Sequence, residues 1–105
     1  MNININFQAP SLKRNEYFSI LKDVNEHLKE LEGQLGNIKS VEIKLYDTMA
    51  DNTNNDKALM ANIKFENESF TEYRISNRWD KVISDVFYNL KLKNVIRNIK
   101  LNLSN

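Results

Sequence analysis

The stretch Val41-Glu42-Ile43-Lys44-Leu45-Tyr46 alternates apolar and polar side chains, which is the pattern of a β-strand with one buried face. Residues 3–7 alternate in the same way and predict an earlier strand. Between the two, apolar residues from Tyr17 to Leu35 recur every three or four positions, which indicates a helix with one apolar side. A helix that joins two strands of one sheet makes a crossover, so we expect these strands to be parallel.

The first helix carries signals at both ends. Its expected buried stripe consists of Tyr17, Leu21, Val24, Leu28, Leu31 and Leu35. Asn15 is a favourable residue for the helix N-cap, and Glu16 would lie in the first turn. Gly33 and Gly36 are typical of a helix end. These signals place the helix between Asn15 and Gly36.

The chain after the quoted strand predicts two further strands. The polar stretch 48–57 predicts a surface loop, and residues 59–65 alternate again as a third strand. The pair Asn67-Glu68 can form a tight turn into a fourth strand at about residues 69–75. Phe70 is out of phase with the other apolar residues of that strand, so the sequence leaves its buried face open. Short connections make these strands an antiparallel meander.

A second helix is expected to begin near Asn77, a favourable N-cap residue, with Asp80 in the first turn. Its expected buried stripe consists of Trp79, Val82, Ile83, Val86, Phe87 and Leu90. After Leu90, the apolar residues fall on the opposite side of a continued helix. We therefore expect the helix to end near residue 93 and to be followed by an extended tail that can add a short strand to a sheet edge.

These elements predict an α+β fold, a two-layer β-α-β-β-β-α sandwich. Its sheet would be mixed and four-stranded, with both helices on one face and the tail as a short C-terminal edge strand. Residues 1–105 would form a single domain, because this length suits one hydrophobic core.

The composition also bounds the class of protein. The chain has no cysteine, which excludes disulfides and thiolate sites. It contains no apolar run near the ~20 residues of a membrane span. The first residues lack the basic and apolar regions of a secretory signal. We therefore expect a cytoplasmic protein that does not bind a membrane.

Few residues suggest catalysis or metal binding. His27 is the single histidine. It flanks the apolar stripe of the first helix, so we interpret it as a residue at the edge of the core. The stretch 51–56 resembles the start of a calcium loop, but Asp56 and Asn62 stand where Gly and Glu are needed. We therefore expect no enzyme activity, no catalytic residue, no metal, no cofactor and no small-molecule substrate.

Charge is distributed unevenly along the chain. Residues 74–105 carry seven basic and two acidic side chains, a net charge of +5, whereas residues 1–73 carry eight basic and twelve acidic side chains, a net charge of −4. The seven candidate phosphate-binding residues are Arg74, Arg78, Lys81, Lys91, Lys93, Arg97 and Lys100. Charge alone leaves two interpretations open: a cationic surface for nucleic acid, or an ordinary solvated helix face.

Several stretches resemble the ribosome hibernation promoting factor family, formerly called sigma-54 modulation proteins. They are Met1-Asn2-Ile3-Asn4-Ile5, residues 28–32, residues 38–45 and residues 78–91. The resemblance covers nearly the whole chain and consists mainly of apolar spacing. The sequence departs from the family pattern at Asn89 and Leu92, where the family usually has Lys and Arg.

The resemblance implies a short-form ribosome hibernation factor. Such a protein would bind the small ribosomal subunit and its rRNA in the decoding channel and inhibit translation by steric occlusion during stress. It would contact RNA phosphates through the seven basic residues and be monomeric off the ribosome. The alternative is a protein–protein interaction module on the same fold, which would use the acidic first helix or the open sheet face.

Overall fold

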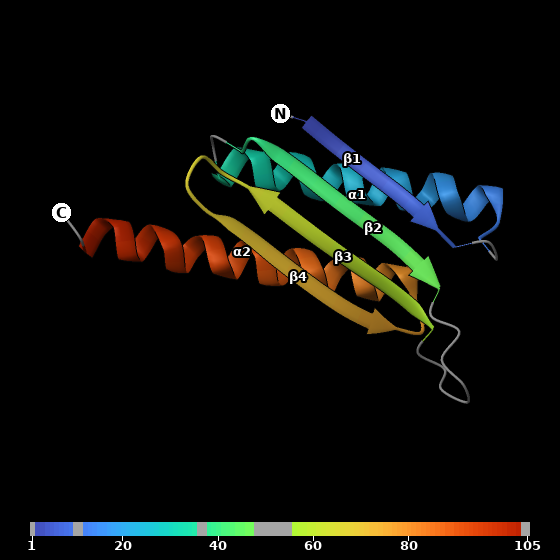
Figure 1. The fold of residues 1–105 in the computed structure, drawn as a ribbon. Coiled ribbons are helices and arrows are strands. Elements are labelled where there is room, and N and C mark those ends of the chain that lie inside the picture. The colour runs from blue at the N-terminus through green and yellow to red at the C-terminus, as the bar shows by residue number, and fades with distance from the viewer. Residues whose placement is uncertain (1, 10–11, 36–37, 48–55, 104–105) are drawn as a thin grey trace.

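Two helices pack on one face of a four-stranded sheet, so the molecule has two layers (Figure 1). This computed structural model of the chain describes residues 2–9, 12–35, 38–47 and 56–103. The elements in chain order are β1 (Asn2–Gln8), α1 (Arg14–Leu35), β2 (Ser40–Asp47), β3 (Lys57–Lys64), β4 (Ser69–Ser76) and α2 (Trp79–Leu103). The expected α+β fold with β-α-β-β-β-α order is therefore confirmed.

The strands follow one another across the sheet in the order β1-β2-β3-β4. β1 pairs with β2 in parallel, with Ile3 opposite Val41 and Ile5 opposite Ile43. β2 with β3 and β3 with β4 pair antiparallel. The mixed sheet and the meander are as expected. The long α1 crossover joins the parallel strands β1 and β2, and shorter connections join the antiparallel pairs.

The hydrophobic core lies between the sheet and the helices. Because side chains alternate across a strand, Val41, Ile43 and Leu45 point to the helix layer, where each is at most 1% exposed. All six residues of the predicted α2 stripe, from Trp79 to Leu90, are buried. Trp79 is thus a core residue, as expected. Figure 1 shows both helices behind the same face of the sheet, α2 behind β3 and β4.

The N-terminal part of α1 differs from the expectation. The helix begins at Arg14, so Asn15 lies in its first turn, where its Oδ1 accepts a hydrogen bond from the Glu16 N–H at 3.0 Å. Tyr17 is 37% exposed and Ile20 is buried instead. The Tyr17 ring lies 4.5 Å from that of Phe7 on the edge strand β1, so its outer side remains in solvent.

The middle of the α1 stripe is as expected. Val24, Leu28 and Leu31 are buried, whereas Leu21 is half-buried. The helix ends at Leu35, close to the predicted end. The side chain of Leu35 lies outside the described residues.

The start of α2 is shifted by two residues from the predicted Asn77. The helix begins at Trp79, and the Val82 N–H donates to the Arg78 carbonyl at 3.2 Å. Arg78 therefore occupies the N-cap position in place of Asn77. Asp80 lies in the first turn, as expected.

The prediction of an extended tail is wrong. α2 continues without interruption to Leu103, and no C-terminal strand occurs in the described part of the chain. The apolar residues after Leu90 lie on the outer side of this helix, where Val95 and Ile99 are about half exposed. The spacing of apolar residues shifts after Leu90 because those residues lie on a different face of the same helix. No glycine or proline follows Leu90, so nothing in the backbone ends the helix.

The connections between strands are partly outside the described residues. This applies to residues 48–55, most of the predicted 48–57 loop and of the calcium-like stretch, while Lys57 already belongs to β3. The tight turn before β4 is confirmed, because the Phe65 N–H donates to the Glu68 carbonyl at 2.8 Å. Over the described residues, neither helix has the length and hydropathy needed to cross a membrane.

Leu90 and Leu92 lie on opposite sides of α2, so truncating them should lower the free energy of unfolding by different amounts. Leu90→Ala should lower the free energy of unfolding by about 2–5 kcal/mol, because it opens a cavity in the core. Leu92→Ala, the matched control two positions later, should cost less than about 1 kcal/mol, since that residue is 44% exposed. Urea denaturation at low protein concentration measures both. Equal losses would contradict the assignment of the two helix faces.

Candidate nucleic-acid interface

The seven candidate basic residues do not form one surface. Arg74 belongs to β4, Arg78 precedes α2, and the remaining five lie on α2. Within α2 they point in different directions, toward β4, toward α1 or into solvent. The structure therefore divides the C-terminal positive charge into separate groups.

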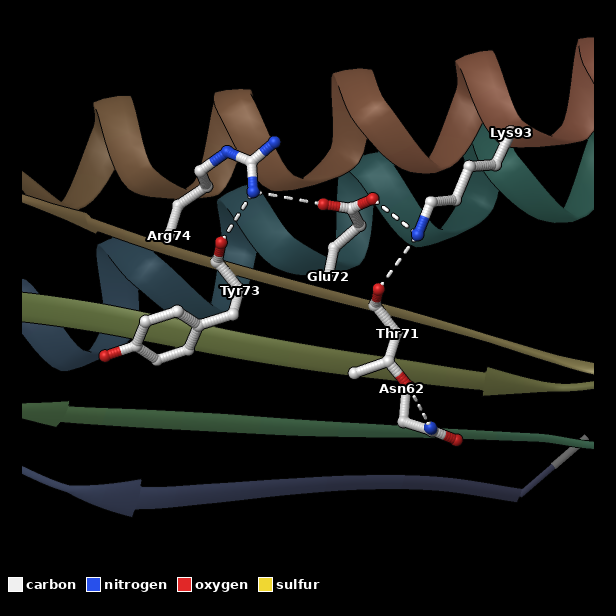
Figure 2. A network of polar contacts seen from close by, with 6 residues as sticks. All are labelled: Asn62, Thr71, Glu72, Tyr73, Arg74 and Lys93. Carbon is white, nitrogen blue, oxygen red and sulfur yellow. Dashed lines mark hydrogen bonds and ion pairs between the residues drawn. The ribbon is translucent and has the colours of Figure 1, made fainter.

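The first group surrounds a buried carboxylate at the β4 edge of the sheet (Figure 2). Glu72 is 8% exposed, and its two oxygens accept from Arg74 Nη1 at 3.2 Å and Lys93 Nζ at 2.7 Å. Lys93 also donates to the Thr71 carbonyl at 3.0 Å, and Arg74 to the Tyr73 carbonyl at 2.7 Å. This network ties the edge strand to α2 and satisfies both cations within the chain.

Glu72 organises two of the candidate cations, and sequence reasoning missed it. The register places it beside Ala61 on the helix face of the sheet, together with Phe70 and Arg74. A carboxylate buried there requires cationic partners, because an unpaired buried charge is costly. The sequence signal was the alternation of side chains along β4. If Phe70 faces the helices, Glu72, two positions later, must face them too.

A second contact lies further along the same edge. Arg97 pairs with Glu68, and its guanidinium lies 4.8 Å from the centre of the Phe65 ring. A groove of about 440 Å³ runs between the start of β4 and the second half of α2. Its lining residues are Glu68, Ser69, Phe70, Thr71, Lys93, Ile96, Arg97 and Lys100. Three of the seven candidate cations therefore meet at one groove.

Two further cations are paired elsewhere. Lys91 lies on the α1 side of α2, where its Nζ is 2.9 Å from Glu30. The hydrogen bond and the charge of Lys91 lower the pKa of the Glu30 carboxyl. Arg78 pairs with Asp80 at the start of α2, and this hydrogen bond lowers the pKa of Asp80.

Lys81 differs from the paired cations. Its side chain is exposed and makes no ion pair or hydrogen bond with any residue that the structure describes. Arg74, Arg78, Lys91, Lys93 and Arg97 form ion pairs with four carboxylates of the chain, which lower the local positive charge. Exposed ion pairs contribute only about 0–1 kcal/mol each, so phosphate groups could displace several of these carboxylates.

The open face of the sheet offers a second surface. Asn4, Glu42, Asn62 and Thr71 form one row across it, and Asn62 donates to Thr71. Near the other end, the rings of Tyr46 and Tyr73 lie 6.2 Å apart. Partial burial and a hydrogen bond with Tyr73 raise the pKa of Tyr46 to about 12.

His27 lies at the edge of the core, as expected. Its ring stacks on Phe87 at 4.9 Å, and its Nε2 lies 3.5 Å from an oxygen of Asp23. These contacts explain its position by packing. Among the residues described, no three His, Cys, Asp or Glu side chains are grouped in a way that could hold a metal ion.

The raised pKa of Tyr46 predicts a loss of stability in alkali. An unfolded tyrosine loses its proton near pH 10, whereas folded Tyr46 does so near pH 12. Between these values only the unfolded state is deprotonated, so the free energy of unfolding should fall as pH rises. Absorbance titration of tyrosinate should show a most alkaline transition that Tyr46→Phe removes. Tyr88→Phe, on the outer side of α2, is the control and should retain it; loss of the transition in both variants or in neither would refute the assignment.

Comparison with known proteins shows the same fold in two solved structures. No family model and no curated protein sequence matches the chain. A ribosomal subunit interface protein from Coxiella burnetii superimposes with a TM-score of 0.65 at 13% identity, covering 94% of this chain and 99% of the other. The Protein Y N-terminal domain from Thermus thermophilus gives 0.62 at 11% identity, covering 89% and 94%. The fold expected from the sequence resemblance is therefore confirmed: this chain has the fold of a ribosomal subunit interface protein and of the Protein Y N-terminal domain.

Proposed function

We propose that this chain is a non-enzymatic ribosome-binding factor that occupies the decoding channel of the small subunit and inhibits translation in the cytoplasm. The supporting observation is the likeness of fold over nearly the full length of two ribosome-associated structures. Fold alone does not specify function, so the proposal also depends on the cations that α2 and β4 present.

The groove beside β4 is the part of the surface best suited to phosphate. Lys93, Arg97 and Lys100 line it from α2. An arginine has five N–H donors, so Arg97 can bind a phosphate while it still contacts Glu68. Lys81 on the outer side of α2 and Arg78 before it add further positive charge. These residues would position the protein on rRNA without reading its sequence.

Inhibition would be steric. A protein that binds through a few phosphate contacts in the channel excludes messenger and transfer RNA while it is bound. Such contacts weaken as salt rises, because binding releases counterions from the RNA. The block would therefore be reversible and would need no chemical step.

A second candidate is a protein–protein interaction module on the same fold. It is favoured by the pairing of at least five of the seven cations with the chain's own carboxylates. It is also favoured by the acidic α1, which carries five Asp or Glu and three Lys or Arg. Charge reversal at Lys81 and Lys91, which leaves the Lys93–Glu72 pair intact, separates the two: it should weaken RNA-driven binding and leave a protein partner's binding unchanged.

Co-sedimentation with purified small ribosomal subunits tests the main proposal. The protein should associate at low salt, dissociate at high salt, and be displaced by messenger RNA already bound in the channel. It should also reduce protein synthesis in a cell-free system. Large subunits serve as the control for unspecific binding to RNA. If the chain does not bind small subunits even at low salt, the proposal is wrong.

An ion pair within the chain should reduce the contribution of a lysine to the salt dependence of small-subunit binding. Lys81→Gln should reduce the slope of log affinity against log salt by about 0.7–0.9, the value for one phosphate contact. Lys91→Gln is the matched control on the same helix and should change the slope less, because binding through Lys91 also frees Glu30. Affinity for small subunits measured over a range of salt gives both slopes. A larger effect at Lys91 would show that the ion pair does not limit phosphate binding.

A further inference from the structure

The outer side of α2 carries a continuous row of exposed apolar side chains. We call this row the outer stripe; its members are Tyr88, Leu92, Val95, Ile96, Ile99 and Leu103. Their exposed fractions run from 44% for Leu92 to 81% for Leu103. The stripe lies opposite the buried residues of the same helix, so the sheet cannot cover it.

The stripe has the spacing of a helix–helix seam. The steps from Tyr88 to Leu92, Val95 and Ile99 are four, three and four residues, which keeps them in line on a helix. At about 100° per residue, all six members fall within about 100° of the helix circumference. Figure 1 shows that the C-terminal part of α2 extends past the ends of the strands.

Three of the four charged residues of this part of α2 contact other elements, and the fourth, Lys100, lines the groove beside β4. Lys91 contacts α1 through Glu30, and Lys93 contacts β4 through Glu72. Arg97 also turns to the β4 side, where it pairs with Glu68. The outer stripe is therefore unsuited to phosphate, and its chemistry fits an apolar partner surface.

The area is sufficient for a specific contact between two copies. Six side chains exposed to this degree present roughly 600 Å² of mostly apolar surface, about the largest patch found on a typical monomer. Two such stripes packed together would bury about 1,200 Å², the lower end of the range for stable interfaces. A second copy is also chemically matched, because it presents the same uncharged row.

We propose that two copies of this chain associate through antiparallel packing of their outer stripes. The midpoint of the stripe lies between Val95 and Ile96, so the twofold axis would pass there. Leu92 would then face Ile99 of the other copy, and Tyr88 would face Leu103. This arrangement replaces the sequence-based expectation of a monomer away from the ribosome.

The charges at the start of α2 decide between antiparallel and parallel packing. Lys81 and Asp85 continue the line of the stripe toward the N-terminus of the helix. In a parallel pair, Lys81 would lie against Lys81 of the other copy and Asp85 against Asp85. Such like-charge contacts are destabilising. In an antiparallel pair both lie beyond the overlap of the two stripes. The helix dipoles also oppose each other in that arrangement, which is favourable.

Sedimentation equilibrium of the isolated protein tests the association. The apparent mass should rise with concentration from 12.4 kDa toward twice that value. Ile99→Glu should raise the dimer dissociation constant at least ~10-fold, because it places a charge in the apolar seam. Asn98→Glu adds the same charge one position away, outside the stripe, and should leave the constant nearly unchanged.

Cysteine cross-linking tests the direction of the helices, since the chain has no cysteine of its own. Val95→Cys lies beside the twofold axis and should form a covalent dimer on oxidation. Tyr88→Cys would lie about 22 Å from its own copy along an antiparallel pair, beyond the reach of a disulfide. Efficient cross-linking of both variants would overturn the antiparallel arrangement.

Other results would overturn the association itself. A monomer at every concentration would do so, as would equal effects of Ile99→Glu and Asn98→Glu. If the protein is monomeric and Ile99→Glu instead weakens binding to small subunits, the stripe is a ribosome contact and not a dimer seam. Because the sedimentation experiment contains no ribosomes, its outcome is independent of the proposed function.

Discussion

The sheet is apolar on one face only, and this constraint determines where every other part of the molecule lies. Val41, Ile43 and Leu45 of β2 are buried on that face, while Glu42 and Lys44 face solvent on the other. Both helices must therefore pack side by side on the same face (Figure 1). α2 then has four sides with different surroundings: the sheet, α1, the β4 edge and solvent.

These surroundings explain the arrangement of positive charge. The cations of α2 that lie next to β4 or α1 meet carboxylates there, Glu72 and Glu68 on one side and Glu30 on the other. Of these carboxylates, Glu72 depends most on its cationic partners, because a buried carboxylate without cations would be strongly destabilising. A basic sequence segment is thereby turned into a surface of moderate charge. RNA binding through it would have to compete with the chain's own acidic groups.

α2 also separates two kinds of recognition chemistry along its circumference. The β4 flank contributes Lys93, Arg97 and Lys100 to a groove, where we propose that phosphate binds. The outer side carries Leu92, Val95 and Ile99, which suit an apolar partner. A single helix therefore contributes to both surfaces, and Ile96, which lines the groove and belongs to the outer stripe, lies where they meet. The departure from the family pattern at Leu92 contributes to the apolar side.

Much of the fold followed from local patterns, because strand alternation and helical spacing are properties of neighbouring residues. The four strands, both helices and the buried stripe of α2 up to Leu90 were predicted on this basis. The same reasoning failed after Leu90. It assumed that apolar residues must face the sheet, so a change of face was taken as the end of the helix.

The sequence by itself determined the order of the elements, the apolar face of β2 and the uneven distribution of charge. Only the tertiary structure decided which cations remain available, because Glu30, Glu68 and Glu72 are distant from their partners in the chain. It likewise decided that the last turns of α2 face solvent. The physical reason is the same in both cases: ion pairing and burial depend on which elements pack together, and local periodicity does not contain that information.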